Sequence, residues 1–351
     1  MSARVRVVVH CRAGRDIGMG HAVRLGALLR EFPEDYDLTC CVDADVAAQH
    51  FPASARFLPP DRSAVASAVR EGGDAGAFTI LVVDLPRDAE EFWSLGGDDV
   101  LTVAVDDHGG PGIAADLVVN QGDIAGTCAY PDLPAHAVLL AGTRYAMVRP
   151  AFSAEPVAGQ ARAGVGFVAG SGERSEAWIR QVVDNLDIRG MAPVRIVVSS
   201  TFSDLRSLAR AGEGRSMEVR GALSAEGMAD FYRRPALCVM TGGMAIFEAM
   251  AMAAPVACYP ILDDMVEPTR LLSQAGALVA LPRQSTAAGA LEPVLRSLLG
   301  DVGSLQALAN AARGLVDGAG CARVAALVRK VAERRLAGQA KREALFMERP
   351  A

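Results

Sequence analysis

The sequence lacks a charge-free stretch long enough to cross a lipid bilayer. The longest such stretch, residues 249–262, has 14 residues and contains two prolines, whereas a membrane-spanning helix needs about 20 apolar residues. Residues 5–9 form a short apolar run that Arg6 interrupts, and no small-residue cleavage pattern follows it, so a signal peptide is not predicted. We therefore predict a cytoplasmic protein without a membrane span.

The sequence also lacks an excess of positive charge. Its 35 Lys and Arg residues stand against 41 Asp and Glu residues, which gives a formal net charge of −6. This balance gives no general electrostatic reason to bind nucleic acid or anionic lipid. A polyanionic ligand would have to be held by local hydrogen-bond donors.

The cysteines form neither a CxxC pair nor a metal-ligand spacing. They stand at positions 11, 40, 41, 128, 238, 258 and 321, most of them within apolar runs. Seven scattered cysteines predict reduced, buried thiols. The sequence predicts neither a metal nor a cofactor.

Length and patterning predict an α/β protein with two Rossmann-like, doubly wound domains that face a cleft. A chain of 351 residues suits about two domains, and apolar runs alternate with helix-like segments in both halves, as in parallel sheets covered by helices. The predicted strands are 5–11, 38–42, 80–84, 101–106 and 117–120, then 165–169, 195–199, 237–240, 255–259 and 277–280. The predicted domains are 1–150 and 163–322, joined by a Pro-, Ala- and Gly-rich linker at 149–164. A basic segment, 323–351, is predicted to be helical over 323–346 and is a candidate to cross back to the first domain.

A glycine-rich turn that follows the first predicted strand carries a histidine. Gly18, Gly20 and His21 lie where this strand leads into a predicted helix, and Arg24 follows one turn later. Glycines at such a turn let backbone N–H groups approach an anionic ligand. An imidazole there titrates near neutral pH and can take a proton from water or a hydroxyl. We predict His21 as the catalytic base, with Gly18, Gly20 and Arg24 in contact with substrate.

Other interpretations of this region stay open at the level of sequence. His21 can be a helix cap and the glycines an ordinary turn. The two glycines and Asp43 partly match a dinucleotide-binding fingerprint, although Val23 stands where the third glycine belongs. Asp43 and Asp45 form an Asp-x-Asp pair typical of metal–nucleotide sites, but no third ligand is evident.

Polar side chains follow three further predicted strands of the first half. Asp84, Asp106 with Asp107, and Asn120 stand at the carboxyl ends of these strands. Ligands of open parallel sheets bind at this edge, so these groups are candidates to orient His21 or to bind sugar hydroxyl and amide groups. Each is also a residue type that ends strands or caps helices. Asp84, Asp106 and Asn120 are the predicted substrate contacts.

Two glycine loops in the second half predict a nucleotide site. They consist of Gly170, Ser171 and Gly172 after strand 165–169, and of Thr241, Gly242 and Gly243 after strand 237–240. Such loops let backbone N–H groups approach a diphosphate, and Glu248 in the next predicted helix can accept hydrogen bonds from ribose hydroxyls. Because apolar residues surround Glu248 in the sequence, its carboxylate also calls for a buried partner. Ordinary αβ turns are the alternative interpretation.

Taken together, these motifs resemble the UDP-sugar hydrolase family of pseudaminic acid biosynthesis and its spore-coat-polysaccharide relatives. The matching segments occur in order through most of the chain: 17–21 with Arg24, 82–84, 105–107, 119–121, 140–145, Arg149 with Phe152, 242–248, and 317–320 with Arg323. The resemblance implies a two-domain GT-B fold. It also implies that His21 is the catalytic histidine and that the Gly170 loop, Gly242, Gly243 and Glu248 bind UDP.

The resemblance implies hydrolysis of UDP-2,4-diacetamido-2,4,6-trideoxy-β-L-altropyranose to UDP and free sugar, in the biosynthesis of a surface glycan. His21 would act as general base for the water that attacks the anomeric carbon with inversion. The loop with Gly242 and Gly243 would stabilise the departing UDP without a metal.

The chain departs from the family pattern at three places. Gly14, Pro86, and Met265 with Val266 stand where the family has an aspartate, a tyrosine and an Asn-Gln pair. These positions are candidates to line the sugar side, so the sugar, the acceptor or the activity itself can differ. The alternatives are an inverting GT-B glycosyltransferase and a nucleotide-sugar-binding protein without turnover.

Overall fold

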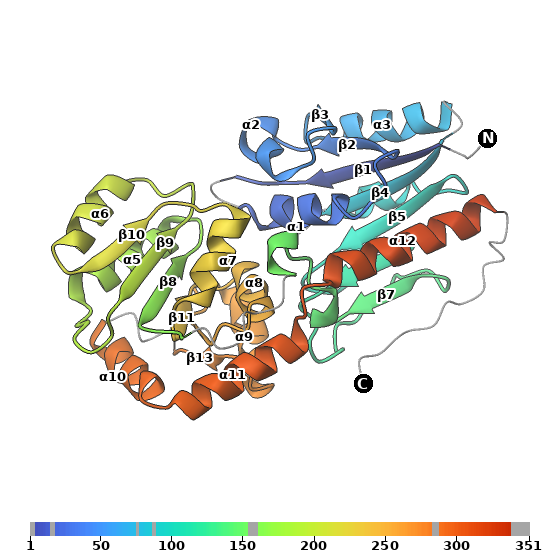
Figure 1. Cartoon of the computed structure of the whole chain (residues 1–351). Coiled ribbons are helices and arrows are strands. Elements are labelled where there is room, and N and C mark those ends of the chain that lie inside the picture. The colour runs from blue at the N-terminus through green and yellow to red at the C-terminus, as the bar shows by residue number, and fades with distance from the viewer. Residues whose placement is uncertain are drawn as a thin grey trace. The chain divides into compact units, whose positions relative to one another are not determined.

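The structure, a computed structural model, describes residues 4–14, 18–74, 77–85, 89–153, 161–282 and 288–337. It divides into two compact units, each with its own sheet (Figure 1). Unit 1 comprises the described parts of residues 1–14, 19–147 and 319–351, and unit 2 those of residues 15–18 and 148–318. The two units are described separately below.

Unit 1 contains, within the described residues, a seven-stranded parallel sheet of order β3-β2-β1-β4-β5-β6-β7. Its strands are β1 (Val5–Cys11), β2 (Asp37–Cys41), β3 (Arg56–Leu58), β4 (Phe78–Asp84), β5 (Val100–Val105), β6 (Leu117–Asn120) and β7 (Val138–Ala141). Every residue of β4 is buried, because helices cover both faces of the sheet. A strand in that position can be apolar throughout.

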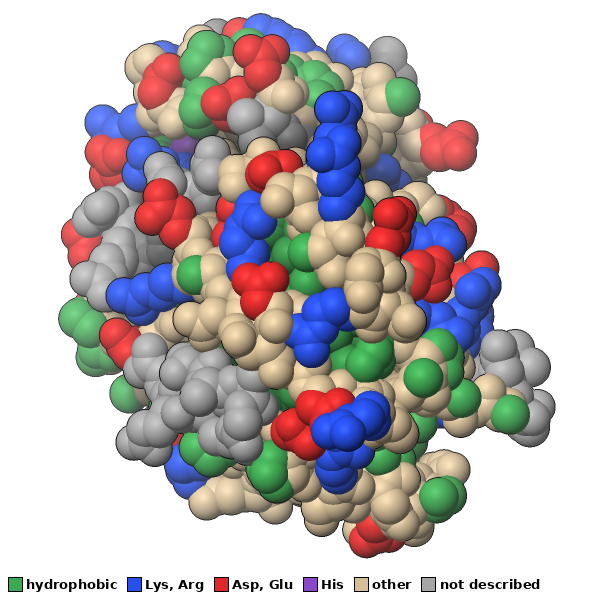
Figure 2. Space-filling view, turned by 90° about the vertical axis from the view of Figure 1, so that its left-hand side faces the viewer, with side chains coloured by type: hydrophobic (Ala, Val, Ile, Leu, Met, Phe, Trp, Pro, Cys, Tyr) green, Lys and Arg blue, Asp and Glu red, His purple; other side chains and the backbone are tan. Residues whose placement is uncertain are grey.

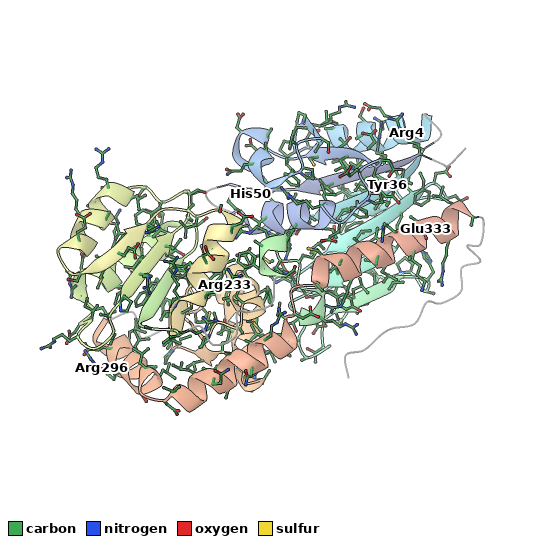
Figure 3. The ribbon with its side chains drawn as sticks, viewed as in Figure 1. Arg4, Tyr36, His50, Arg233, Arg296 and Glu333 are labelled. Carbon is green, nitrogen blue, oxygen red and sulfur yellow. The ribbon has the colours of Figure 1, made fainter. Side chains whose placement is uncertain are left out.

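Alternate residues of β1 serve two different cores. Val7 and Val9 join α1 (Gly20–Leu29) and α12 (Gly320–Leu336) on one face, while Val8 joins α3 (Arg62–Asp74) and α4 (Glu90–Trp93) on the other. Although α12 follows unit 2 in the chain, its Val324 and Val328 lie in the core of unit 1. Tyr36 packs against the same core (Figure 3). The remaining short elements of unit 1 are α2 (Ala44–Ala47), η1 (Ala48–His50) and η2 (Thr143–Tyr145).

Unit 2 contains, in the part of the chain that is described, a six-stranded parallel sheet of order β10-β9-β8-β11-β12-β13. The strands are β8 (Val165–Ala169), β9 (Val194–Val198), β10 (Met217–Arg220), β11 (Leu237–Met240), β12 (Val256–Cys258) and β13 (Val279–Ala280). The helices are η3 (Pro150–Phe152), α5 (Glu173–Asn185), α6 (Leu205–Glu213), α7 (Ala225–Arg233), α8 (Ala245–Ala251), η4 (Asp263–Met265), α9 (Val266–Gln274), α10 (Ala288–Leu299) and α11 (Val302–Leu315). In the core, the rings of Trp178 and Tyr259 stack 5.7 Å apart. Arg296 on α10 (Figure 3) donates to the carbonyl of Asp187 after α5, at 3.2 Å.

The predicted α/β class with two doubly wound sheets is confirmed. The first residues of the predicted linker are packed within unit 2. Phe152 is fully buried in unit 2, and its ring lies 6.0 Å from that of Tyr232. A Pro- and Ala-rich segment therefore begins as a packed turn, and the units divide at Met147. Residues 154–160 of the proposed linker, and the predicted helix beyond residue 337, lie outside the described residues.

None of the described helices is long and apolar enough to span a membrane. On the face shown in Figure 2, side chains of both charge signs are interspersed, in keeping with the small net charge of −6.

Candidate functional site

The histidine turn lies at the switch point of the unit 1 sheet. From β1 the sheet extends through β2 to β3 on one side and through β4 to β7 on the other. Ligands of open parallel sheets bind at the carboxyl edge beside such a reversal. His21 stands in the first turn of α1, which follows β1, and Asp84 is the last residue of β4, paired in register with Cys11. The topology thus brings together two residues that are 63 positions apart in the chain.

Four side chains form a connected network here, which we call the His21 cluster: His21, Arg24, Asp84 and Asp107. The Nδ1 atom of His21 lies 2.6 Å from Oδ1 of Asp84. Arg24 donates to both oxygens of Asp84, at 2.6 Å from Nε and 2.6 Å from Nη2. It also donates to both oxygens of Asp107, at 2.7 Å from Nη1 and 2.8 Å from Nη2. One guanidinium therefore bridges two carboxylates.

The contact with Asp84 determines which imidazole nitrogen carries the proton. A carboxylate can only accept, so a 2.6 Å contact requires a proton on Nδ1. The 3.2 Å approach of Arg24 Nη2 to the same atom is then a contact between two donors and not a hydrogen bond. In the neutral ring the lone pair is left on Nε2. That is the arrangement of a general base oriented by a carboxylate.

The electrostatics of the cluster favour a basic imidazole. Burial lowers the pKa of His21, but the charge and hydrogen bond of Asp84 outweigh it, so the pKa is raised above its usual value. Burial raises the pKa of Asp84, yet Arg24 and His21 overcome this and hold it well below its usual range. Asp84 stays ionised and can stabilise the imidazolium that forms when His21 takes a proton.

Not all the predicted substrate contacts have side chains that are free to reach a ligand. Asp84 is fully buried between His21 and Arg24, so of its two predicted roles the structure supports orienting His21. Arg24, 2% exposed, is likewise enclosed by its two carboxylates. In the structure both side chains support His21, and their predicted direct contacts with substrate stay a prediction.

Asp106 and Asn120 hold a loop. Asp106 Oδ2 accepts hydrogen bonds from the N–H groups of His108 and Gly109 and from the hydroxyl of Tyr130. Asn120 is fully buried, and its amide donates to the same hydroxyl at 2.8 Å. Buried polar groups need such internal partners, and the predicted substrate contacts of these two residues stay a prediction. The neighbouring Asp107 is not among the predicted substrate contacts, yet its carboxylate joins the His21 cluster and its side chain is 35% exposed.

Gly18 and Gly20 remain candidate backbone contacts. Gly18 has a φ of +87°, a left-handed conformation that favours glycine, and Gly20 is the first residue of α1. Their predicted contact with substrate stays a prediction. Gly14 lies just before this turn, and Pro86 lies outside the described residues.

The two glycine loops of unit 2 meet at the switch point of the second sheet. β8 pairs with β9 on one side and with β11 on the other. The N–H of Gly170, just after β8, donates to the hydroxyl of Thr241, just after β11, at 3.1 Å. Gly172 ends the first loop with a φ of +98° and precedes α5. Binding of a diphosphate by Gly170, Ser171, Gly172, Gly242 and Gly243 stays a prediction, and the topology puts both loops at the edge where ligands bind.

Met265 packs against the second loop. A Cβ atom at Gly242 would lie 2.6 Å from Sδ of Met265, and one at Gly243 would lie 3.9 Å from its Cε. The adjacent Val266 is 37% exposed. Of the two apolar residues, Met265 thus borders the predicted nucleotide loop.

Gly242→Ala is expected to destabilise unit 2 by about 1–3 kcal/mol, because φ there is +108° and alanine rarely adopts it. It should also weaken the predicted binding of UDP in calorimetry, because the loop must shift. The matched control is Gly314→Ala in α11, where φ is ordinary and a Cβ meets no atom within 4 Å. Gly242→Ala with Met265→Ala removes the contact with the thioether and retains the backbone strain. If Gly242→Ala matched the control in both stability and UDP affinity, the strain argument would be wrong.

The partner of the buried Glu248 is Arg149, whose side chain is 21% exposed. Arg149 donates from Nε at 2.7 Å and from Nη2 at 2.9 Å to the two oxygens of the carboxylate. The guanidinium also lies over the ring of Phe152, 5.1 Å from its centroid. Burial raises the pKa of Glu248 above its usual value even though Arg149 opposes the rise. The pair is confirmed as a structural element, and the contact of Glu248 with ribose stays a prediction.

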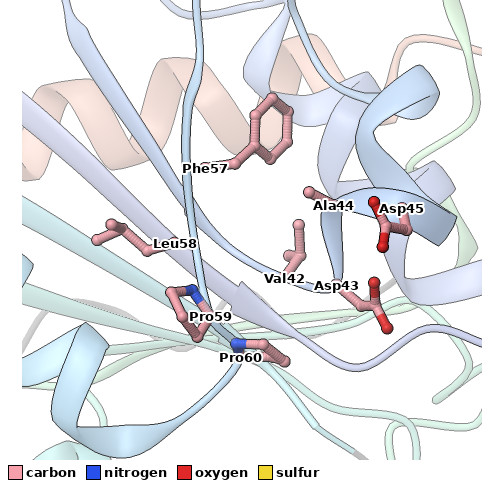
Figure 4. A pocket seen from close by; sticks show the side chains of 8 residues that line it. All are labelled: Val42, Asp43, Ala44, Asp45, Phe57, Leu58, Pro59 and Pro60. Carbon is pink, nitrogen blue, oxygen red and sulfur yellow. The ribbon is translucent and has the colours of Figure 1, made fainter.

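A surface pocket of about 320 Å³ lies at the carboxyl ends of β2 and β3 (Figure 4). It is lined by Val42, Asp43, Ala44, Asp45, Phe57, Leu58, Pro59 and Pro60, none of which belongs to the His21 cluster. Asp43 and Asp45 are exposed. In the described parts of the chain, no group of three or more His, Cys, Asp or Glu side chains is arranged to hold a metal.

Comparisons with known proteins show the fold. No protein-family model matches the chain, and no curated protein matches it in sequence. Among solved structures, the calicheamicin glycosyltransferase CalG4 matches with a TM-score of 0.61 and 14% identity, over 97% of this chain and 100% of that one. MurG of Acinetobacter baumannii matches with a TM-score of 0.61 and 12% identity, over 93% and 99% of the chains. UDP-GlcNAc 2-epimerase of Neisseria meningitidis, bound to UDP-GlcNAc, matches with a TM-score of 0.58 and 8% identity, over 93% and 100%. The chain therefore has the GT-B fold.

Proposed function

We propose that this protein is a UDP-sugar hydrolase of the GT-B fold that uses His21 as its general base. The observation that carries the proposal is the contact of His21 Nδ1 with Asp84, which leaves the basic lone pair on Nε2 at the switch point of a parallel sheet. The structural neighbours include an epimerase bound to a UDP-sugar and several glycosyltransferases, which supports a nucleotide sugar as the substrate.

In the proposed reaction, His21 Nε2 takes a proton from the attacking water as its oxygen forms a bond to the anomeric carbon. The bond from that carbon to the diphosphate oxygen breaks, and its electron pair leaves with UDP. Asp84 holds the ring and stabilises the imidazolium. Binding of a diphosphate by backbone N–H groups of the glycine loops is a separate proposal, made for unit 2 by itself. UDP-2,4-diacetamido-2,4,6-trideoxy-β-L-altropyranose is the proposed substrate.

An inverting glycosyltransferase is the second candidate, because glycosyltransferases recur among the structural neighbours. The same base would then deprotonate a sugar or protein hydroxyl in place of water. The two candidates differ in what accepts the sugar.

The test is to incubate the purified protein with the proposed UDP-sugar, without acceptor or metal, and to follow UDP and free sugar over time. UDP-GlcNAc serves as a control donor. Equal amounts of UDP and free sugar, released over many turnovers, support the hydrolase. UDP binding without release from either donor would contradict it and favour the transferase or a binding protein.

A further inference from the structure

We infer that Asp107 is a positioning residue, which clamps Arg24 against Asp84 and thereby holds the His21 imidazole in one orientation and one tautomer. Asp107 acts on His21 through Arg24 and Asp84. Only the kinetic consequence of this role rests on the proposed function, since the clamp itself can be measured on the protein alone.

The geometry of Arg24 supports the clamp. Its guanidinium has five N–H groups in a rigid plane, and it donates four hydrogen bonds to the two aspartates. Nη2 is shared between Oδ1 of Asp84 and Oδ2 of Asp107, at 2.6 and 2.8 Å. Because the plane is rigid, the position of Asp107 fixes the direction from which Arg24 meets Asp84. Asp84 in turn fixes the imidazole through a single 2.6 Å contact.

Charge leads to the same assignment. With neutral His21, the cluster contains two carboxylates and one guanidinium, so it carries one negative charge that protonation of His21 would cancel. Without Asp107, Arg24 and Asp84 would already neutralise each other. The extra carboxylate therefore adds to the stabilisation of the imidazolium that Asp84 provides.

Within the described residues, the charged groups that act on His21 are Arg24 on α1, Asp84 at the end of β4, and Asp107 after β5. Cys11 at the end of β1 lies beside Asp84, and burial raises the pKa of its thiol, so it stays neutral. Of the charged groups, Asp84 and Asp107 raise the pKa of His21 and Arg24 lowers it. Removing Asp107 therefore acts in one direction, because a raising charge is lost and Arg24 is freed to act more strongly.

The experiment is NMR titration of protein labelled with ¹³C and ¹⁵N in histidine. The chain has five histidines, and the His21 signal is assigned from His21→Asn. In Asp107→Asn, the titration of His21 should have its midpoint at a lower pH than in the wild type. The ¹⁵N shifts should show less of the Nδ1–H tautomer. Asp107→Glu restores the charge and should recover the midpoint at least in part. Glu91→Gln removes an exposed ion pair with Arg62 in the same unit and should leave the titration midpoint and tautomer of His21 unchanged.

A midpoint and tautomer in Asp107→Asn equal to those of the wild type would overturn the inference. Asp107→Ser is prepared in parallel, so that misfolding of one variant leaves the test intact. If the proposed function holds, the acid limb of kcat/KM in Asp107→Asn should move to lower pH, and kcat should fall by about 10–100-fold, as for other residues that orient a functional ligand. A shifted midpoint in a protein that turns over no UDP-sugar would leave the clamp in place and reject only the proposed function.

Discussion

His21→Asn is expected to reduce UDP release by about 10³-fold, the order of magnitude that a positioned general base contributes. Asparagine can still hydrogen-bond to Asp84, but its amide has no basic lone pair to accept a proton at neutral pH. The measurement is the initial rate of UDP release from the diacetamido UDP-sugar, compared with UDP affinity by calorimetry. Affinity should change by less than about 2-fold, since the predicted diphosphate loops belong to unit 2.

The matched control is His136→Asn, the same substitution on another histidine of unit 1. His136 contacts Asp116 at 2.8 Å, and Asp116 lies just before β6, at the amino edge of the sheet. Turnover by the His136→Asn variant should remain that of the wild type. Equal losses in the two variants would point to damage to the fold, and unchanged turnover in His21→Asn would remove His21 from the mechanism.

Arg149→Met is expected to lower the free energy of unfolding of unit 2 by about 3–5 kcal/mol, the usual cost of leaving one member of a buried ion pair alone. The carboxylate of Glu248 would lose both of its hydrogen bonds from Arg149 while remaining buried. Urea unfolding monitored by tryptophan fluorescence measures this. Trp178 lies in unit 2 and Trp93 in unit 1, so a Trp93→Phe background reports on unit 2 alone.

The double variant Arg149→Met with Glu248→Leu tests whether the unpaired charge is the cause. Replacing both members of a buried pair by apolar residues of similar volume is often close to neutral, so stability should largely return. A double variant as unstable as Arg149→Met would mean that the lost packing of Arg149 on Phe152 accounts for the effect.

The loss of stability in Arg149→Met should also depend on pH. Burial raises the pKa of Glu248, and Arg149 opposes that rise. Removal of the Arg149 guanidinium therefore raises the pKa of Glu248 further. A folded state that binds a proton more tightly than the unfolded state loses stability as pH rises and regains it as pH falls. The stability deficit of Arg149→Met relative to the wild type should therefore be largest at neutral pH. It should shrink as the pH falls toward the usual pKa of a glutamate. A deficit independent of pH would contradict this account.

Much of the fold follows from local sequence patterns. The ends of β1, β6, β8 and β11 coincide with the predicted strands, because apolar runs bounded by polar or glycine residues mark strands buried on both faces. The predictions omitted β3, β7 and β10, which lie at three of the sheet edges. β3 and β10 contain exposed residues. A strand that is covered less completely needs no continuous apolar run, so the pattern that identifies central strands does not find it.

The sequence by itself determined the fold class, the histidine turn after β1, the glycine loops after β8 and β11, and the need of Glu248 for a partner. These features depend on residues that are close together in the chain, so the sequence shows their spacing directly. Only the tertiary structure decided that Asp107 and not Asp106 joins the cluster, that Asp84 meets His21 through Nδ1, and that Arg149 is the partner of Glu248. These pairs are separated by 63 to 99 positions, and the partner is chosen by strand order and by the direction of a side chain at a strand end. Local periodicity in the sequence indicates neither the strand order nor the direction of such a side chain.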